Sequence, residues 1–156
     1  MPEIFHTASA EETEQLGYRL AECFKTDPEL PPFLALYGGL GVGKTVFVRG
    51  FTAAIAPGVP VRSPTFALVH EYPAVPRPVF HFDLYRIKDE DDLISIGFYD
   101  YFHRNGIILT EWSENIPDCL PDTYLEVTLE KDNPDDPDSR KITVRYIKNG
   151  IEEAPR

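Results

Sequence analysis

A glycine-rich segment of the chain has the composition and spacing needed to hold the phosphates of a nucleotide. Its residues match the pattern Gly-x-x-x-x-Gly-Lys-Ser/Thr and are Gly38, Gly39, Leu40, Gly41, Val42, Gly43, Lys44 and Thr45. Glycines allow backbone N–H groups to converge on phosphate oxygens without interference from side chains. The Lys44 ammonium would reach the β- and γ-phosphates, and the Thr45 hydroxyl would bind Mg²⁺. The segment therefore predicts a site for a magnesium-bound nucleoside triphosphate.

Two acidic residues could position the metal ion and an attacking water molecule. Asp83 follows the apolar run 79–82, and Glu111 follows the apolar run 107–110. A nucleotide hydrolase needs a carboxylate at a strand end for this purpose. Spacing alone does not choose between the two acids, and either could instead cap a helix or pair with Arg86. We expect at least one of them to serve the phosphate loop, and both are candidate catalytic residues.

The segment Ser63-Pro64-Thr65-Phe66 is a further candidate, because its hydroxyls could reach Mg²⁺ or the γ-phosphate as switch loops do. The alternative is a turn that leads into a strand. Trp112, the single tryptophan, directly follows Glu111. Its default interpretation is core packing, and the alternative is that it covers the nucleotide site or a partner surface. His81 lies inside an apolar run and is predicted to be a packed residue rather than a metal ligand.

The segments on either side of the phosphate loop are predicted to form a strand and a helix. The apolar run 33–37 predicts a strand before the loop, and the stretch 46–56 predicts an amphipathic helix after it. Upstream, Ser9 and Glu12 have the spacing of a capping box at the start of another helix. Strand, loop and helix in this order are the context in which such a loop binds phosphate.

The rest of the chain adds mostly strands. We expect strands at 4–7, 66–72, 79–84 and 107–110, a short helix at 89–96, and two exposed edge strands at 124–129 and 142–147 joined by an acidic loop. Helices and strands alternate at first, and strands dominate later. The predicted fold is α/β, a P-loop NTPase-like three-layer α/β sandwich with a mixed central sheet, parallel at the nucleotide end and antiparallel elsewhere.

Size and charge narrow the possible functions. The 156 residues, 42% of them hydrophobic, predict a single domain, 1–156, with little chain left to bind a large acceptor. The net charge of −11 disfavours direct binding of nucleic acid. Cys23 and Cys119 lack a metal-ligand spacing and are expected to stay reduced, and we see no membrane-spanning or signal segment. These features predict a cytoplasmic protein, with no role at a membrane.

Several segments together resemble the TsaE (YjeE) family, small bacterial ATPases needed for the threonylcarbamoyladenosine modification of tRNA. The resemblance covers nearly the whole chain, and the segment 93–101 looks like the family's Leu-x-x-x-Gly stretch. The family usually has an acid at the position of Gly39, so this chain departs from the pattern there. The segments that carry the resemblance are 38–45, Ser63-Pro64-Thr65-Phe66, His81-Phe82-Asp83-Leu84-Tyr85-Arg86 and Glu111-Trp112-Ser113-Glu114.

The resemblance implies ATP and Mg²⁺ as ligands and roles for individual residues. It places Thr65 in a switch-like loop, makes Asp83 and Glu111 the functional acids with Glu111 near the metal, and sets Trp112 beside the site. It implies TsaD and TsaB as partners, which carry the threonylcarbamoyl transfer and most tRNA contacts, so that tRNA is met only indirectly. Two alternatives remain open at this point: a small-molecule or protein kinase of the P-loop class, and a nucleotide-dependent interaction module.

Overall fold

The computed structural model describes residues 2–62, 64 and 67–153, which form an eight-stranded sheet with helices on both faces. The strands follow the order β1-β7-β6-β2-β5-β4-β3, and β8 pairs with β7. The strands are β1 (Glu3–Thr7), β2 (Phe33–Tyr37), β3 (Val69–Tyr72), β4 (Val79–Asp83), β5 (Ile107–Glu111), β6 (Thr123–Asn133), β7 (Asp136–Lys148) and β8 (Ile151–Glu153). The helices are α1 (Ala10–Thr26), α2 (Lys44–Ile55), α3 (Glu90–Ser95) and the 3-10 segments η1 (Phe98–His103) and η2 (Ser113–Asn115).

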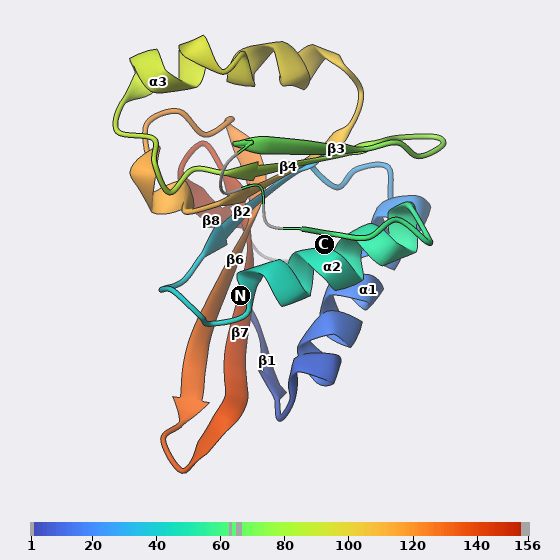
Figure 1. The fold of residues 1–156 in the computed structure, drawn as a ribbon, viewed down its shortest axis with the longest axis vertical. Coiled ribbons are helices and arrows are strands. Elements are labelled where there is room, and N and C mark those ends of the chain that lie inside the picture. Colours follow the sequence, from blue (N-terminus) through green and yellow to red (C-terminus); the bar gives the residue numbers. More distant parts are fainter. Residues whose placement is uncertain (1, 63, 65–66, 154–156) are drawn as a thin grey trace.

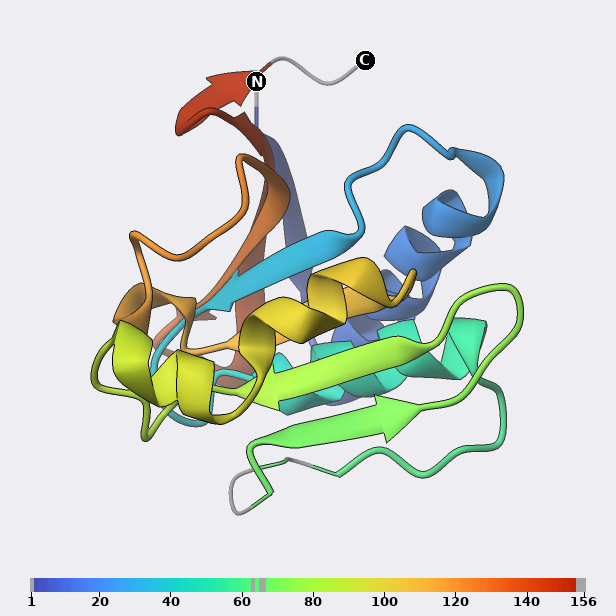
Figure 2. The ribbon, with the colours of Figure 1, turned by 90° about the horizontal axis from the view of Figure 1, so that it is seen from above.

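The sheet is mixed, as the sequence predicts. Strand β2 pairs in parallel with both β5 and β6, and β4 pairs in parallel with β5. The outer strands β3, β7, β1 and β8 join by antiparallel pairing. In Figure 2, β2 and β4 point the same way while β3 runs back beside β4. The carboxyl ends of β2, β4 and β5 therefore meet at the same edge of the sheet.

The predicted three-layer arrangement is confirmed. Helices α1 and α2 cover one face of the sheet, and α3 with η1 covers the other (Figure 1). Strand β2 is buried on both sides, and its side chains alternate between two hydrophobic cores: Leu34 and Leu36 face α2, whereas Phe33 and Ala35 belong to the core on the α3 side. This alternation is the period of two expected of a strand, and it explains the continuous apolar run.

Helix α1 begins as the capping box predicts. The Ser9 hydroxyl accepts a hydrogen bond from the Glu12 N–H at 3.2 Å, and the Glu12 carboxylate accepts one from the Ala8 N–H at 2.6 Å. Leu16 and Phe24 are buried in the core on this side of the sheet, where the Phe24 ring packs edge-on against Phe51 of α2. Helix α2 begins at Lys44, earlier than the predicted residue 46, so that Lys44 and Thr45 lie in its first turn.

The sequence correctly predicts strands over 124–129 and 142–147, but the prediction that they lie at the edge of the sheet is wrong. The edge strands are β1, β3 and the short β8, whereas β6 lies between β2 and β7, and β7 pairs with β6, β1 and β8. Both strands extend far beyond 124–129 and 142–147, and they meet in a hairpin that projects from the body of the protein (Figure 1). From Glu130 to Asn133 the side chains of β6 are exposed, so the pairing there depends on backbone hydrogen bonds that leave no hydrophobic pattern in the sequence.

Strand β3 is shorter than the sequence predicts. The strand predicted over 66–72 begins at Val69 in the structure, and Phe66 lies outside the described residues. Cys23 and Cys119 are free thiols. No helix in the described part of the chain is long and apolar enough to cross a membrane.

Candidate functional site

The phosphate loop connects the end of β2 to the start of α2, and its backbone requires glycine at specific points. Gly38 has a φ of 142°, and a Cβ added there would lie 2.6 Å from the Leu129 carbonyl oxygen. Gly43 has a φ of 100° and forms the N-cap of α2 without any side-chain cap. The first N–H groups of α2 are therefore open to an anion, which the helix dipole also favours.

The remaining loop residues differ in what they contribute. Gly41 also has a positive φ, of 76°. Gly39 has neither a positive φ nor any atom within 4 Å of an added Cβ, so a side chain would fit at this position. Leu40 is 86% exposed and can offer only backbone groups, whereas Val42 is buried in the core and anchors the loop.

Lys44 is folded back against the loop that it follows. Its Nζ donates a hydrogen bond to the Gly38 carbonyl oxygen at 2.5 Å and lies 3.7 Å from the centre of the Trp112 ring. Burial lowers the pKa of Lys44, while the carboxylates of Glu114, Glu111 and Asp83 act in the opposite direction. The ammonium thus lies at the meeting point of the loop and the acids, where a phosphate would compete for it.

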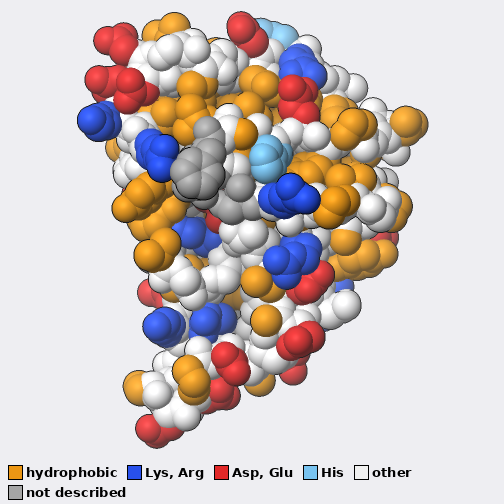
Figure 3. All heavy atoms as spheres, in the orientation of Figure 1, with side chains coloured by type: hydrophobic (Ala, Val, Ile, Leu, Met, Phe, Trp, Pro, Cys, Tyr) orange, Lys and Arg blue, Asp and Glu red, His pale blue; other side chains and the backbone are white. Residues whose placement is uncertain are grey.

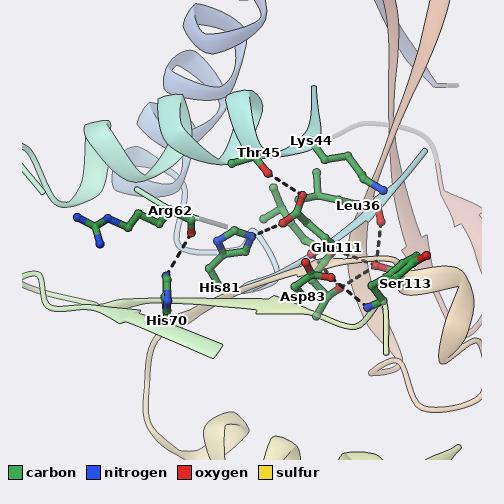
Figure 4. A network of polar contacts seen from close by, with 12 residues as sticks. Leu36, Lys44, Thr45, Arg62, His70, His81, Asp83, Glu111 and Ser113 are labelled. Atoms are coloured by element: carbon green, nitrogen blue, oxygen red, sulfur yellow. Dashed lines mark hydrogen bonds and ion pairs between the residues drawn. The ribbon is translucent and has the colours of Figure 1, made fainter. Parts of the chain in front are cut away.

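The two acids predicted from the strand ends lie side by side. Asp83 and Glu111 are direct neighbours in the parallel pairing of β4 and β5, and both are buried. The Asp83 Oδ1 accepts a hydrogen bond from the Tyr85 N–H at 3.0 Å, which fixes the turn after β4. Glu111 Oε1 accepts a hydrogen bond from the Thr45 hydroxyl at 3.2 Å (Figure 4). The structure therefore brings the predicted metal-binding pair, Thr45 and Glu111, into direct contact.

Trp112 lies directly over this edge in an unusual backbone conformation. Its φ of 60° is in the left-handed region, which non-glycine residues seldom occupy. The segment after it is held firmly, because the Ser113 hydroxyl donates to the Leu36 carbonyl oxygen at 3.1 Å and the Asn115 amide donates to the Leu84 carbonyl oxygen at 2.8 Å. Strained residues of this kind persist where the surroundings determine them, and they concentrate at functional sites.

Two residues of the site were missed by the sequence interpretation. His81 is buried as predicted, but its Nε2 also lies 2.7 Å from Glu111 Oε2. Its position two residues before Asp83, on the same face of β4, was the signal available. Arg140 of β7 donates from Nε to the Val42 carbonyl oxygen at 2.8 Å, on the outside of the phosphate loop. Nothing in the local sequence indicates this second contact, which depends on the register of the β6–β7 hairpin.

The residues present fit a magnesium nucleotide. Thr45 and Glu111 offer hard oxygen ligands beside a glycine-framed loop, and Mg²⁺ typically takes one or two carboxylates together with phosphate oxygens and water. In the described ranges there is no cluster of three or more His, Cys, Asp or Glu side chains that could hold a metal without such a ligand. Thr65 lies outside the described residues, so its catalytic role stays a prediction.

Comparisons with known proteins identify the family of the chain. Residues 7–142 match the family model described as threonylcarbamoyl adenosine biosynthesis protein TsaE. The chain is 33% identical to the tRNA threonylcarbamoyladenosine biosynthesis protein TsaE of Bacillus subtilis, over 95% of this chain and 88% of that protein. It is 38% identical to TsaE of Haemophilus influenzae over 74% of each chain.

A solved structure supports the same conclusion. The crystal structure of Bacillus subtilis YdiB superimposes with a TM-score of 0.75 at 29% identity, covering 96% of this chain and 88% of that one. Family model, relatives and fold thus agree over most of the length. The chain belongs to the TsaE family.

Proposed function

We propose that the protein binds and hydrolyses ATP with Mg²⁺, and that this activity serves the formation of N6-threonylcarbamoyladenosine in tRNA. The observation that carries the proposal is the contact of Thr45 with Glu111 at the opening of the phosphate loop. Family membership supports the role in tRNA modification. ATP rather than GTP is proposed from the family resemblance, and the sequence contains no Asn/Thr-Lys-x-Asp segment for guanine.

Each residue has a specific part in the proposed reaction. The loop backbone and the Lys44 ammonium hold the phosphates, and Thr45 and Glu111 hold the metal ion. Mg²⁺ supplies charge neutralisation at the β- and γ-phosphate oxygens. Glu111 orients the attacking water through the metal ion, and Asp83, its buried neighbour in the β4–β5 pairing, accepts the proton of that water. Trp112 excludes bulk water from the Lys44 side of the site.

The partners in this proposal are TsaD and TsaB, and tRNA is contacted only through them. The protein carries a net charge of −11, and on the face shown in Figure 3 its Lys and Arg side chains are interspersed with Asp and Glu rather than gathered in a basic stripe. Such a surface is unsuited to binding a phosphate backbone directly. ATP and ADP would shift assembly or resetting of the complex through their different affinities for its states.

A cytoplasmic location is also part of the proposal. Cys23 and Cys119 are both free, as is usual for proteins in a reducing compartment. Transfer RNA and ATP are available in the same compartment. Fractionation of cells that carry a tagged chain would test this location directly.

The decisive experiment measures phosphate release from ATP with Mg²⁺, for the protein alone and with TsaD and TsaB. We expect slow turnover alone and clear stimulation by the partners, with Lys44→Ala inactive in both cases. Tracing the γ-phosphate separates this function from a kinase, because hydrolysis yields only inorganic phosphate. Label found on an acceptor molecule, or no stimulation by the partners, would contradict the proposal.

A further inference from the structure

A buried histidine contacts the acid that this site uses. His81 is fully buried on β4, and its Nε2 lies 2.7 Å from Glu111 Oε2 (Figure 4). Its other ring nitrogen, Nδ1, is also buried and has no hydrogen-bond partner among the described residues. An apolar side chain would avoid the penalty of that orphaned nitrogen, and both flanking residues, Phe80 and Phe82, are apolar. Packing alone therefore does not explain a histidine here.

The two oxygens of Glu111 have separate partners. Oε1 accepts a hydrogen bond from Thr45, and Oε2 faces His81. A carboxylate can only accept hydrogen bonds, so with Glu111 in that form the geometry assigns the shared proton to Nε2 of His81. This tautomer leaves Nδ1 as the acceptor without a partner among the described residues. His81 and Asp83 lie two residues apart on β4. This strand therefore carries Asp83 and also the residue that contacts Glu111.

We propose that His81 is a positioning residue whose Nε2–H fixes the Glu111 carboxylate so that Oε1 faces Thr45. The inference rests on the proposed function, because it concerns the acid of that same site. Groups that orient a metal ligand in this way typically alter affinity or activity about 10- to 100-fold. Without this donor, Oε2 of Glu111 loses its partner, and the carboxylate is free to turn away from Thr45. Turnover then falls, while the loop backbone still holds the nucleotide.

The test compares two substitutions of His81 with a matched control. His81→Phe keeps a ring in the core and removes the donor, whereas His81→Gln places an amide N–H near the position of Nε2. His70→Phe is the control, because His70 is the cross-strand partner of His81 and contacts the Arg62 carbonyl oxygen instead. The Arg62 backbone keeps its hydrogen bonds with Tyr72 when His70 is replaced.

The measurements are ATP turnover in the presence of TsaD and TsaB, and affinity for a non-hydrolysable ATP analogue. We expect His81→Phe to lower kcat about 10- to 100-fold and to change the analogue Kd less than about threefold, with His81→Gln regaining most of the rate. In a Glu111→Gln background, His81→Phe should have no further effect on kcat. Equal losses of rate and affinity, no rescue by glutamine, or a full additional loss in that background would overturn the inference.

A second measurement needs neither turnover nor a His81 variant. Nitrogen-15 NMR of histidine-labelled wild-type protein should show the His81 ring proton on Nε2, exchanging slowly with solvent, and Glu111→Ala should abolish that slow exchange. A proton on Nδ1 with a bare Nε2 would overturn the inference even if ATP is hydrolysed. Conversely, absence of ATP hydrolysis alongside the expected Nε2 proton would refute the proposed function while the hydrogen bond stands.

Discussion

The parallel and antiparallel halves of the sheet hold charged side chains in different ways. At the carboxyl ends of β4 and β5, His81, Asp83 and Glu111 are buried and hydrogen-bonded. On the β6–β7 hairpin, Arg145 pairs with Glu126 at 2.9 Å, with side chains 37% and 21% exposed. Buried charges are costly and keep precise positions, whereas exposed pairs add little stability. Substitutions of the buried residues in the parallel half should therefore change the rate of ATP hydrolysis. Substitutions of exposed pairs in the antiparallel half should change the free energy of unfolding only slightly.

The largest effect is expected for Lys44→Ala. This change removes the ammonium at the meeting point of the loop and the acids, so ATP affinity should fall about 100-fold and turnover should stop. Lys148→Ala, an exposed lysine of β7, is the matched control and should leave both unchanged. Calorimetry with an ATP analogue measures the affinity. Unchanged affinity in Lys44→Ala would contradict the assignment of the loop.

Removal of charge from the buried acids comes next. Glu111→Gln and Asp83→Asn should each lower kcat about 100- to 1,000-fold, because their charge is needed mainly in the transition state. Affinity for the analogue should change much less. Glu126→Gln, the same change in the antiparallel half, should leave kcat as it is. Equal losses of affinity and rate in the buried variants would show that the acids serve binding alone.

Arg140 gives a sharper test, because it lies in the antiparallel half but contacts the loop. Its guanidinium donates to the Val42 carbonyl oxygen, and loss of this bond should loosen the loop and weaken ATP binding about 10-fold in Arg140→Ala. Arg145→Ala on the same strand is the control. Titration of both variants with an ATP analogue decides: equal affinities would mean that β7 does not contribute to the site.

The smallest effect is expected for the partly exposed ion pair of Glu126 and Arg145 in the antiparallel half of the sheet. Glu126→Gln should lower the free energy of unfolding by about 0.5 kcal/mol, because the Arg145 pair is partly screened by solvent. Urea unfolding measures this loss of stability. Added salt should make the difference between the variant and the wild type smaller, because salt screens the pair. A loss above about 2 kcal/mol would place this pair among the buried, structurally demanding interactions.

The sequence predicts those parts of the molecule that local patterns determine. The phosphate loop, the cap at Ser9 and the acids at the ends of β4 and β5 all follow from short-range spacing. The hydrogen bond of His81 with Glu111 depends on the pairing of two strands that are distant in the sequence. The contact of Arg140 with Val42 joins residues 98 positions apart, and it depends on the register of the β6–β7 hairpin. The exposed end of the hairpin lacks an apolar face, so hydrophobic patterning could not reveal its length.

Gly39 has a consequence for how this site can vary among related proteins. Because a Cβ there would meet open space and the backbone is not left-handed, one nucleotide change in the gene could install a carboxylate without refolding the loop. Such a side chain would alter the electric field at the proposed phosphate site while Gly38 and Gly43 keep their conformation. In the proposed function, the affinity for a triphosphate can thus be adjusted at a single position, separately from the glycines that shape the loop.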